Sequence, residues 1–448
     1  MEKSLLRNFA KYVSLNILGM VGLSFYVLAD TYFIAKALGA TGIASLNLSI
    51  AVYGLLHGIG LMLGIGGATR FSILKAQRKD NKAAQVFSTS IKLGLVAGVL
   101  LAIIGLFGSK HLALALGANG FTLPMTKIYL MTILTFAPFF IVNNIVITFV
   151  RNDNNPNLSM LAMLAGSFSN IILDYVFMFP LKMGMFGAAF ATGLAPVISI
   201  CLLLLHFIKN KNMITALKEK IVWPLVPDLS ALGLPAFVVE ISSSVVLITF
   251  NWVILGLEGN LGVAAYGVIA NLAFVGVAIF TGLAQGVQPL ASHYYGLGDD
   301  VKVEKIRNLA MLASVFMAIA IYSGVLFSTD NIIGLFNSEN NTEIVRIAGT
   351  GLRIYFLGFF FLGINIVTTI FLGAIEKARE AFIISIARGF IIIVPLVLVF
   401  SRIWGMIGVW SAFVVSELIV MIMAIYFAAA KGRLLRSKHG AHQESALG

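Results

Sequence analysis

The sequence predicts an all-α integral membrane protein, with twelve transmembrane helices in two parallel six-helix repeats around a central cleft. Three observations support this prediction. Hydrophobic residues make up 59% of the chain and charged residues only 11%, whereas soluble domains carry about 25% charged residues. Apolar runs of about 20 residues, the length that crosses a bilayer, recur from one end of the chain to the other. The second half of the chain also repeats glycine positions of the first.

The apolar runs define the predicted spans. They lie near 11–37, 47–70, 86–107, 124–150, 157–179, 186–208, 230–256, 263–288, 306–327, 346–374, 380–400 and 405–429. The loops between them are mostly short, so we expect no separate soluble domain. The single cysteine, Cys201, excludes an internal disulfide framework.

The basic residues orient these spans. A net charge of +12 in a soluble protein would favour nucleic-acid binding, but here Lys and Arg are confined mainly to short loops. Of the 31 Lys and Arg residues, 22 fall on the side that holds both predicted termini and 7 on the opposite side. Positively charged loops remain cytoplasmic, so we expect both termini in the cytoplasm and no nucleic-acid partner.

The repeat appears when the chain is compared with itself at an offset of 220 residues. Gly39 and Gly42 then align with Gly259 and Gly262, and Gly66 aligns with Gly286. Six spans in each half make the halves parallel repeats, the architecture of many secondary transporters. The predicted segments are an N-terminal lobe at 1–208, a cytoplasmic linker at 209–229, a C-terminal lobe at 230–430 and a basic cytoplasmic tail at 431–448.

Polar side chains from three predicted spans share one depth in the first half. At 1.5 Å per residue, Asp30, Asp174 and Thr192 each lie about 8–10 Å from the outer end of their span. Tyr26 and Asn170 precede the two aspartates by four residues, which places each pair on one helix face. Two carboxylates in a dry site repel, so one should hold a proton near physiological pH. The same oxygens would alternatively cage a small cation.

Two alternatives to a coupling role remain open for this cluster. Both aspartates could lie at water-exposed helix ends, or they could belong to a buried structural network that does not couple to an ion. Ionisable groups within lipid are nevertheless functional candidates by default.

Four further ionisable residues lie near the middle of predicted spans. Glu240 would bind a cationic substrate or a second ion, or it would be a buried neutral or paired carboxyl. Arg388 and Glu417 have opposite charges at matching depth, which favours a structural ion pair. His57 has no evident partner in the sequence, so we expect a packing or hydrogen-bonding role.

Sequence signatures for catalysis are absent. No phosphate-binding loop, haem, zinc or nucleophile-elbow motif occurs, so we expect neither enzyme activity, nor a catalytic residue, nor a metal site.

Several motifs carry a family resemblance. They are Asp30 near the end of the first span, the run Arg-Asn-Asp-Asn-Asn-Pro at 151–156, Asn170 with Asp174, the run from Gly184 to Thr192, and Leu234-Pro235 ahead of Glu240. Together with Arg388 and Pro395 they resemble the multidrug and toxic compound extrusion (MATE) family, in its DinF/MepA-like bacterial branch. The resemblance extends to about residue 430.

The resemblance implies a cation-coupled antiporter that exports amphipathic, mainly cationic drugs and toxins by alternating access. It places Tyr26, Asp30, Asn170, Asp174 and Thr192 at the ion-coupling site, with H⁺ favoured over Na⁺ and no other cofactor. The NorM-like branch adds a span-seven glutamate, which Glu240 matches, and a span-ten acid, which residues 351–374 lack. The expected partners are small amphipathic organic substrates and membrane lipid, for a monomer in the bacterial cytoplasmic membrane.

Two other functions are weighed against this one. A lipid-linked saccharide flippase of the same superfamily often has fourteen spans and cationic residues in its cleft, which the acidic first half disfavours. A polytopic membrane enzyme would need converging His, Asp or metal-binding groups, and only six His are present.

Overall fold

The computed structural model describes residues 2–209, 217–218, 220–336 and 342–444, and no strand occurs among them. Part of the predicted linker (210–216 and 219) and the end of the predicted tail (445–448) lie outside the described residues. The chain divides into two compact units, Met1–Ser244 and Val245–Gly448. The prediction of an all-helical membrane protein is confirmed.

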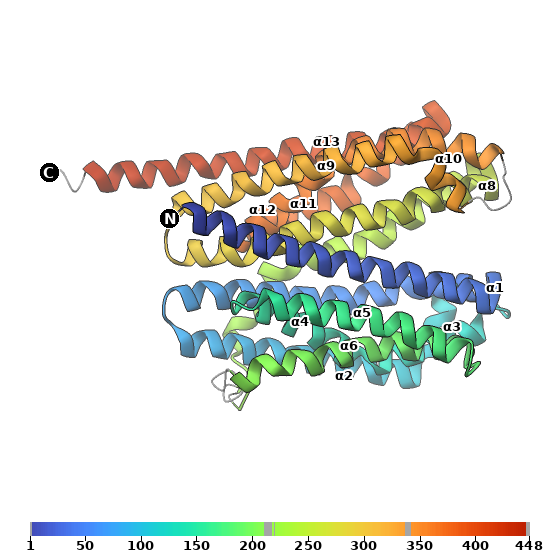
Figure 1. Cartoon of the computed structure of the whole chain (residues 1–448), viewed down its shortest axis with the longest axis horizontal. Coiled ribbons are helices and arrows are strands. Elements are labelled where there is room, and N and C mark those ends of the chain that lie inside the picture. The colour runs from blue at the N-terminus through green and yellow to red at the C-terminus, as the bar shows by residue number, and fades with distance from the viewer. Residues whose placement is uncertain (1, 210–216, 219, 337–341, 445–448) are drawn as a thin grey trace. The chain divides into compact units, whose positions relative to one another are not determined.

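The helices follow one another in a simple order (Figure 1). The first unit contains α1 Glu2–Ala76, α2 Asp80–Ala115, α3 Leu123–Thr135, α4 Ala137–Asn152, α5 Pro156–Met178, α6 Gly184–Lys209 and the 3₁₀ turn η1 Trp223–Leu225. Helix α8, Val226–Gly296, belongs to the first unit as far as Ser244 and to the second unit beyond it. The second unit continues with α9 Asp300–Phe336, α10 Thr342–Tyr355, η2 Phe356–Gly358, α11 Phe359–Ala374, α12 Ala378–Ile386, the π-helical turn η3 Ala387–Ile391 and α13 Ile393–Glu444.

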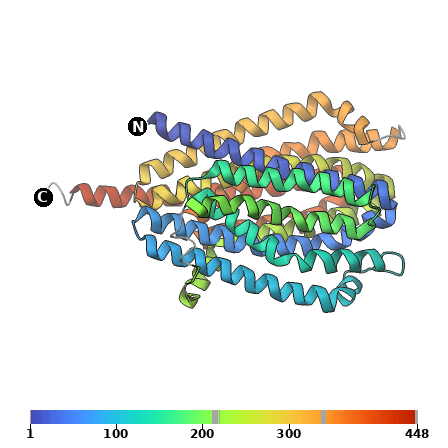
Figure 2. The same ribbon diagram turned by 60° about the horizontal axis from the view of Figure 1, so that its bottom comes forward.

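Eight helices of the described residues are long and apolar enough to cross a membrane, and nine are if α3 and α4 count as one bent span. Three of the eight are interrupted by a glycine with positive φ: Gly39 in α1, Gly259 in α8 and Gly405 in α13. Each interruption lies at or beside the boundary between two predicted spans. Figures 1 and 2 show α1 folding back on itself as a hairpin. The exact number of spans stays a prediction.

One predicted span is bent. The run 124–150 forms α3 and α4, which meet at Phe136 with an angle of 50°. Pro138 lies in the first turn of α4 and has no backbone N–H to donate to the preceding helix. The hydrophobic run is therefore continuous, but the helix is not.

The two halves of the chain repeat each other in backbone geometry. Gly39 has φ 64° and ψ −155°, and Gly259 has φ 59° and ψ −150°. These values lie in a region that only glycine occupies without strain. A side chain added at Gly42 would meet the isoleucine eight residues earlier, and one added at Gly262 would do the same. The glycines that align in sequence are thus equivalent in structure.

The turns after α1 and α8 repeat as well. Lys79 N donates to Leu74 O at 2.9 Å, and Asp299 N donates to Tyr294 O at 3.0 Å. The residue before each donor has positive φ, 59° at Arg78 and 72° at Gly298. The two halves therefore match at the 220-residue offset in a connecting turn as well as in the spans. A shared pattern of hydrophobic residues would not by itself produce this match in a turn.

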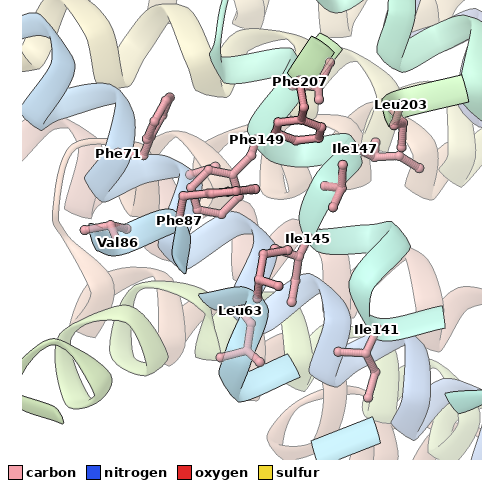
Figure 3. Close-up of a cluster of buried hydrophobic side chains, with 14 of the residues drawn as sticks. Leu63, Phe71, Val86, Phe87, Ile141, Ile145, Ile147, Phe149, Leu203 and Phe207 are labelled. Atoms are coloured by element: carbon pink, nitrogen blue, oxygen red, sulfur yellow. The ribbon is translucent and has the colours of Figure 1, made fainter. Parts of the chain in front are cut away.

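A buried aromatic cluster holds four helices of the first unit together (Figure 3). Phe149 of α4 contacts Phe71 of α1 and Phe87 of α2, edge to face, with ring centroids 5.3 and 5.1 Å apart. Phe87 also stacks on Phe207 of α6 at 5.4 Å. Edge-to-face aromatic pairs add about 0.5–1.5 kcal/mol each beyond the area that they bury. The cluster thus joins α1 and α6, two of the helices that carry the polar residues described below, to α2 and α4.

Helices α1 and α8 approach closely within the first unit because glycines face the partner backbone. A Cβ built at Gly233 would overlap the carbonyl oxygen of Met62, and one built at Gly66 would overlap that of Leu229. Small residues at such positions let membrane helices pack backbone against backbone.

We expect Gly233→Ala to lower thermal stability, because the added methyl group meets main chain that cannot rotate away. Overpacking of this kind costs about 1–3 kcal/mol. Gly256→Ala, in the same helix with open space around its Cβ position, is the matched control and should keep the wild-type melting temperature. Thermal unfolding of the two purified variants in detergent measures the difference. Equal melting temperatures would contradict the close packing.

Candidate functional site

Asp30 and Asp174 meet inside the first unit. Asp30 lies on the part of α1 before Gly39, Asp174 lies on α5, and both side chains are buried. The two carboxyl groups interact directly, and a hydrogen bond between them forms only when one of them is protonated. The Oδ1 atom of each has no donor among the described residues. Two charged carboxylates in contact without a counterion would be strongly unfavourable in a dry site. The arrangement therefore demands a shared proton or a bound cation.

Asn170 and Thr192 connect this pair to α6. With its amide oriented so that both polar atoms are paired, Asn170 donates to Asp174 Oδ2 at 3.0 Å and accepts from Thr192 N at 3.1 Å. Thr192 Oγ1 donates to Ala188 O at 3.0 Å. Asn170 and Asp174 lie one turn apart on α5, as their four-residue spacing predicts. Asn170 thus fixes the orientation of the Asp174 carboxylate.

Three tyrosines surround the carboxylates. Tyr26 lies within electrostatic reach of Asp30, but its hydroxyl pairs with that of Tyr53 at 2.6 Å. Tyr129 of α3 is hydrogen-bonded to Thr192 and within electrostatic reach of both aspartates. The structure thus brings the five residues predicted from the sequence to one place.

Sequence reasoning missed Tyr53 and Tyr129. Tyr129 lies five residues inside the predicted span 124–150, or about 8 Å from its outer end, the depth of the other members. That depth is the signal that would have found it. Tyr53 precedes His57 by one helical turn, but its pairing with Tyr26 depends on the α1 hairpin.

The turn between α4 and α5 comes from the run at 151–156. Asn155 caps α5 by accepting from Leu158 N at 3.3 Å, Pro156 follows at the first helical position, and Asn154 has a φ of 60°. These are the residues that helix starts and left-handed turns favour. The turn sets the position at which α5 begins, and thereby the depth of Asp174.

The same turn anchors a second buried polar network. Asp153 accepts from Lys75 of α1 through Oδ1 and pairs with His206 of α6 through Oδ2 at 2.8 Å. Arg151 donates to Asn16 of α1 at 2.7 Å. Asp153 has a basic partner on each oxygen, and the contacts tie α1, the end of α4 and α6 together at one end of the first unit.

Glu240 pairs with His57. The distance between Glu240 Oε2 and His57 Nδ1 is 3.3 Å, with both residues in the first unit. This contact agrees with the packing or hydrogen-bonding role expected for His57. The sequence did not reveal the partner, because it lies on α8, which packs on the glycine face of α1. Glu240 is thus paired in the structure, and its predicted role in binding a substrate or a second ion stays a prediction.

Arg388 and Glu417 form an ion pair in the second unit. Arg388 Nε donates to Glu417 Oε1 at 2.8 Å, and Asn365 donates to both Oε2 and the backbone carbonyl of Glu417, at 2.7 and 2.8 Å. Arg388 lies in the π-helical turn η3, where Ile392 N donates to Ala387 O. Pro395 cannot donate to the carbonyl four residues earlier, so the helix widens ahead of it.

Two comparisons of sequence place this chain among known proteins. The family model MatE matches residues 16–176 and 235–399. The multidrug export protein MepA of Staphylococcus saprophyticus is 29% identical over 404 residues, which cover 89% of this chain and 88% of that protein. The MepA protein of Staphylococcus aureus is 28% identical over 422 residues, with 91% and 90% coverage.

Solved structures share the fold. A MATE protein in complex with MaL6 superposes with a TM-score of 0.90 at 22% identity, covering 96% of this chain and 97% of that one. The outward-facing conformation of a multidrug resistance MATE family transporter gives 0.90 at 23% identity, with 96% of each chain covered. A MOP superfamily transporter from Pyrococcus furiosus, for which a reversed polarity of the binding pocket suggests a different function, gives 0.88 at 22% identity and 96% coverage of each.

Proposed function

The chain belongs to the MatE family, and from that premise we propose that it is a cation-coupled antiporter that exports amphipathic, mainly cationic compounds. It is a multi-pass membrane protein and a transport protein rather than an enzyme, and the family resemblance drawn from its motifs is confirmed. Multidrug export is the activity named for its MepA relatives. Our proposal adds four properties to these: the coupling ion, the charge of the substrate, the monomeric state and the cytoplasmic location of both termini.

The observation that carries the proposal is the contact between Asp30 and Asp174, with an unpartnered oxygen on each. Binding of a cation changes the net charge of the Asp30–Asp174 pair. Because a net charge is costly in a dry site, this change alters which arrangement of the surrounding helices has the lower free energy. Under this proposal, a cation that enters from outside neutralises the pair. The first arm of α1 then repacks against α5 and α6 and expels the substrate.

The donor set favours H⁺ over Na⁺. In the amide orientation that pairs both of its polar atoms, Asn170 turns its N–H group toward Asp174 and its oxygen toward Thr192 N, and so supplies no oxygen ligand to a cation. Hard cations are held by several oxygen ligands, whereas a proton needs only the two carboxylate oxygens. Residues 351–374 contain no Asp or Glu, so this chain lacks the span-ten carboxylate that would be a further cation ligand in a NorM-like site.

A flippase with a cationic cleft is the alternative that the fold leaves open. The structurally similar transporter from Pyrococcus furiosus illustrates that binding pockets of different polarity occur in this fold. Three acidic side chains in the first unit, Asp30, Asp174 and Glu240, favour cationic substrates instead.

Dye efflux tests the proposal directly. We expect cells that carry the protein to extrude a monocationic dye when an inward ΔpH is imposed, and to respond far less to an inward Na⁺ gradient at equal pH. Fluorescence of preloaded, energy-depleted cells gives the rate. Efflux with Na⁺ alone would reverse the choice of ion, and no efflux with either gradient would overturn cation-coupled export.

A further inference from the structure

His57 and Glu240 form a pair at mid-membrane depth. His57 lies 17 residues after Ala40 and 19 before Ala76 on the second arm of α1, about 25–30 Å from either end. The Glu240 side chain is 31% exposed and that of His57 16%. A carboxylate exposed to hydrocarbon at this depth would be costly. The exposed part of Glu240 must therefore face water or a bound molecule.

Packing holds the pair in place. The imidazole of His57 stacks on the ring of Tyr53, with centroids 6.2 Å apart and an interplanar angle of 9°. A Cβ built at Gly58 would lie 3.0 Å from the ring of Phe237 and 3.4 Å from the Cβ of Glu240. Phe237 and Glu240 of α8 can approach α1 this closely because Gly58 has no side chain.

The aromatic rings suit an organic cation. Tyr53 and Phe237 lie on either side of the pair along the α1–α8 contact, and aromatic faces attract cationic groups by about 0.5–2 kcal/mol. The titratable groups that face the pair from the same unit are Tyr53, and beyond it Tyr26 and Asp30. Tyr53 lies within electrostatic reach of both Asp30 and Glu240.

We propose that Glu240 binds the cationic group of the substrate, and that a proton on His57 competes with it. This inference rests on the proposed export function. A protonated His57 beside Glu240 gives a pair of zero net charge. A bound monocation beside Glu240, with His57 neutral, gives the same total. Holding both cations would leave an uncompensated positive charge at low dielectric. Substrate binding thus releases the His57 proton to water, and His57 is the residue that makes substrate affinity depend on pH.

Equilibrium binding of tetraphenylphosphonium, a permanent monocation, tests this proposal. The measurement uses full-length protein in nanodiscs that carries Asp30→Asn and Asp174→Asn, so that the acidic pair contributes no protons. We expect this protein to bind the cation, with a Kd that rises about tenfold for each unit by which pH falls below the titration of His57. Proton release into weak buffer should accompany binding.

Two added substitutions separate the roles of the pair. Glu240→Gln should weaken binding about tenfold or more, whereas Glu258→Gln, a carboxylate farther along α8, should leave the Kd unchanged. His57→Gln should keep the cation bound but remove both the pH dependence and the proton release. An unchanged Kd in Glu240→Gln, or a pH dependence that survives His57→Gln, would overturn the proposal.

A measurement without substitutions guards against misfolded variants. Above the titration of His57, where its imidazole is neutral with or without the ligand, bound tetraphenylphosphonium should shield it and slow its modification by diethyl pyrocarbonate in the wild-type protein. Mass spectrometry reads the modification, and an unchanged rate would contradict the proposal. The binding measurements do not depend on whether Asp30 and Asp174 form the coupling site. Efflux that survives in the double aspartate variant would refute the role of Asp30 and Asp174, but it would leave these binding results standing.

Discussion

Asp30→Asn and Asp174→Asn are each expected to reduce ΔpH-driven efflux to the level of cells without the transporter. The amide is close in shape to a protonated carboxyl, so each variant should fold and reach the membrane. It cannot release a proton, however, and the cycle needs both the charged and the neutral state of the pair. The measurement is dye efflux at equal expression, checked by the amount of protein in membranes and by its melting temperature.

Asp330→Asn is the matched control, because Asp330 is an exposed carboxylate of α9. It should export at the wild-type rate. The variants of the pair would still bind substrate, since they mimic the protonated form. Robust ΔpH-driven efflux by the double variant would move the coupling site elsewhere, with Glu240 as the next candidate.

Arg388→Ala is expected to destabilise the second unit strongly while leaving the range of exported compounds unchanged. Glu417 is 3% exposed in its side chain, and without Arg388 the one donor to its carboxylate among the described residues is Asn365. Removing one partner of a buried ion pair commonly costs about 3–5 kcal/mol. Lower expression and a lower melting temperature, with an unaltered ranking of substrates in the remaining protein, are the expected results.

The pair also predicts a non-additive double variant. Arg388→Ala/Glu417→Ala leaves no buried charge, so it should be less destabilised than the sum of the single variants. Arg402→Ala, which removes an exposed arginine of α13, should keep wild-type stability. If Arg388→Ala melts at the same temperature as Arg402→Ala, the ion pair has no structural role.

The sequence by itself determined the properties that depend on position along one helix. Hydropathy placed the spans, because a bilayer of fixed thickness imposes their length. The 220-residue offset found the paired glycines, since both occupy backbone conformations that exclude side chains. Depth and four-residue spacing brought Asp30, Asp174, Asn170 and Thr192 to one site, because rise per residue and helical period are constants.

Only the tertiary structure decided which side chains meet across helices. Tyr26 with Tyr53 and His57 with Glu240 depend on how each helix is rotated about its axis and on how closely its neighbour approaches. A hydropathy pattern in a membrane helix says little about that rotation, because lipid and protein interiors are equally apolar. The 50° bend at Phe136 and the π-helical turn at Arg388 were likewise missed. Both lie near prolines, whose effect on a helix depends on the neighbours that satisfy the freed carbonyl groups.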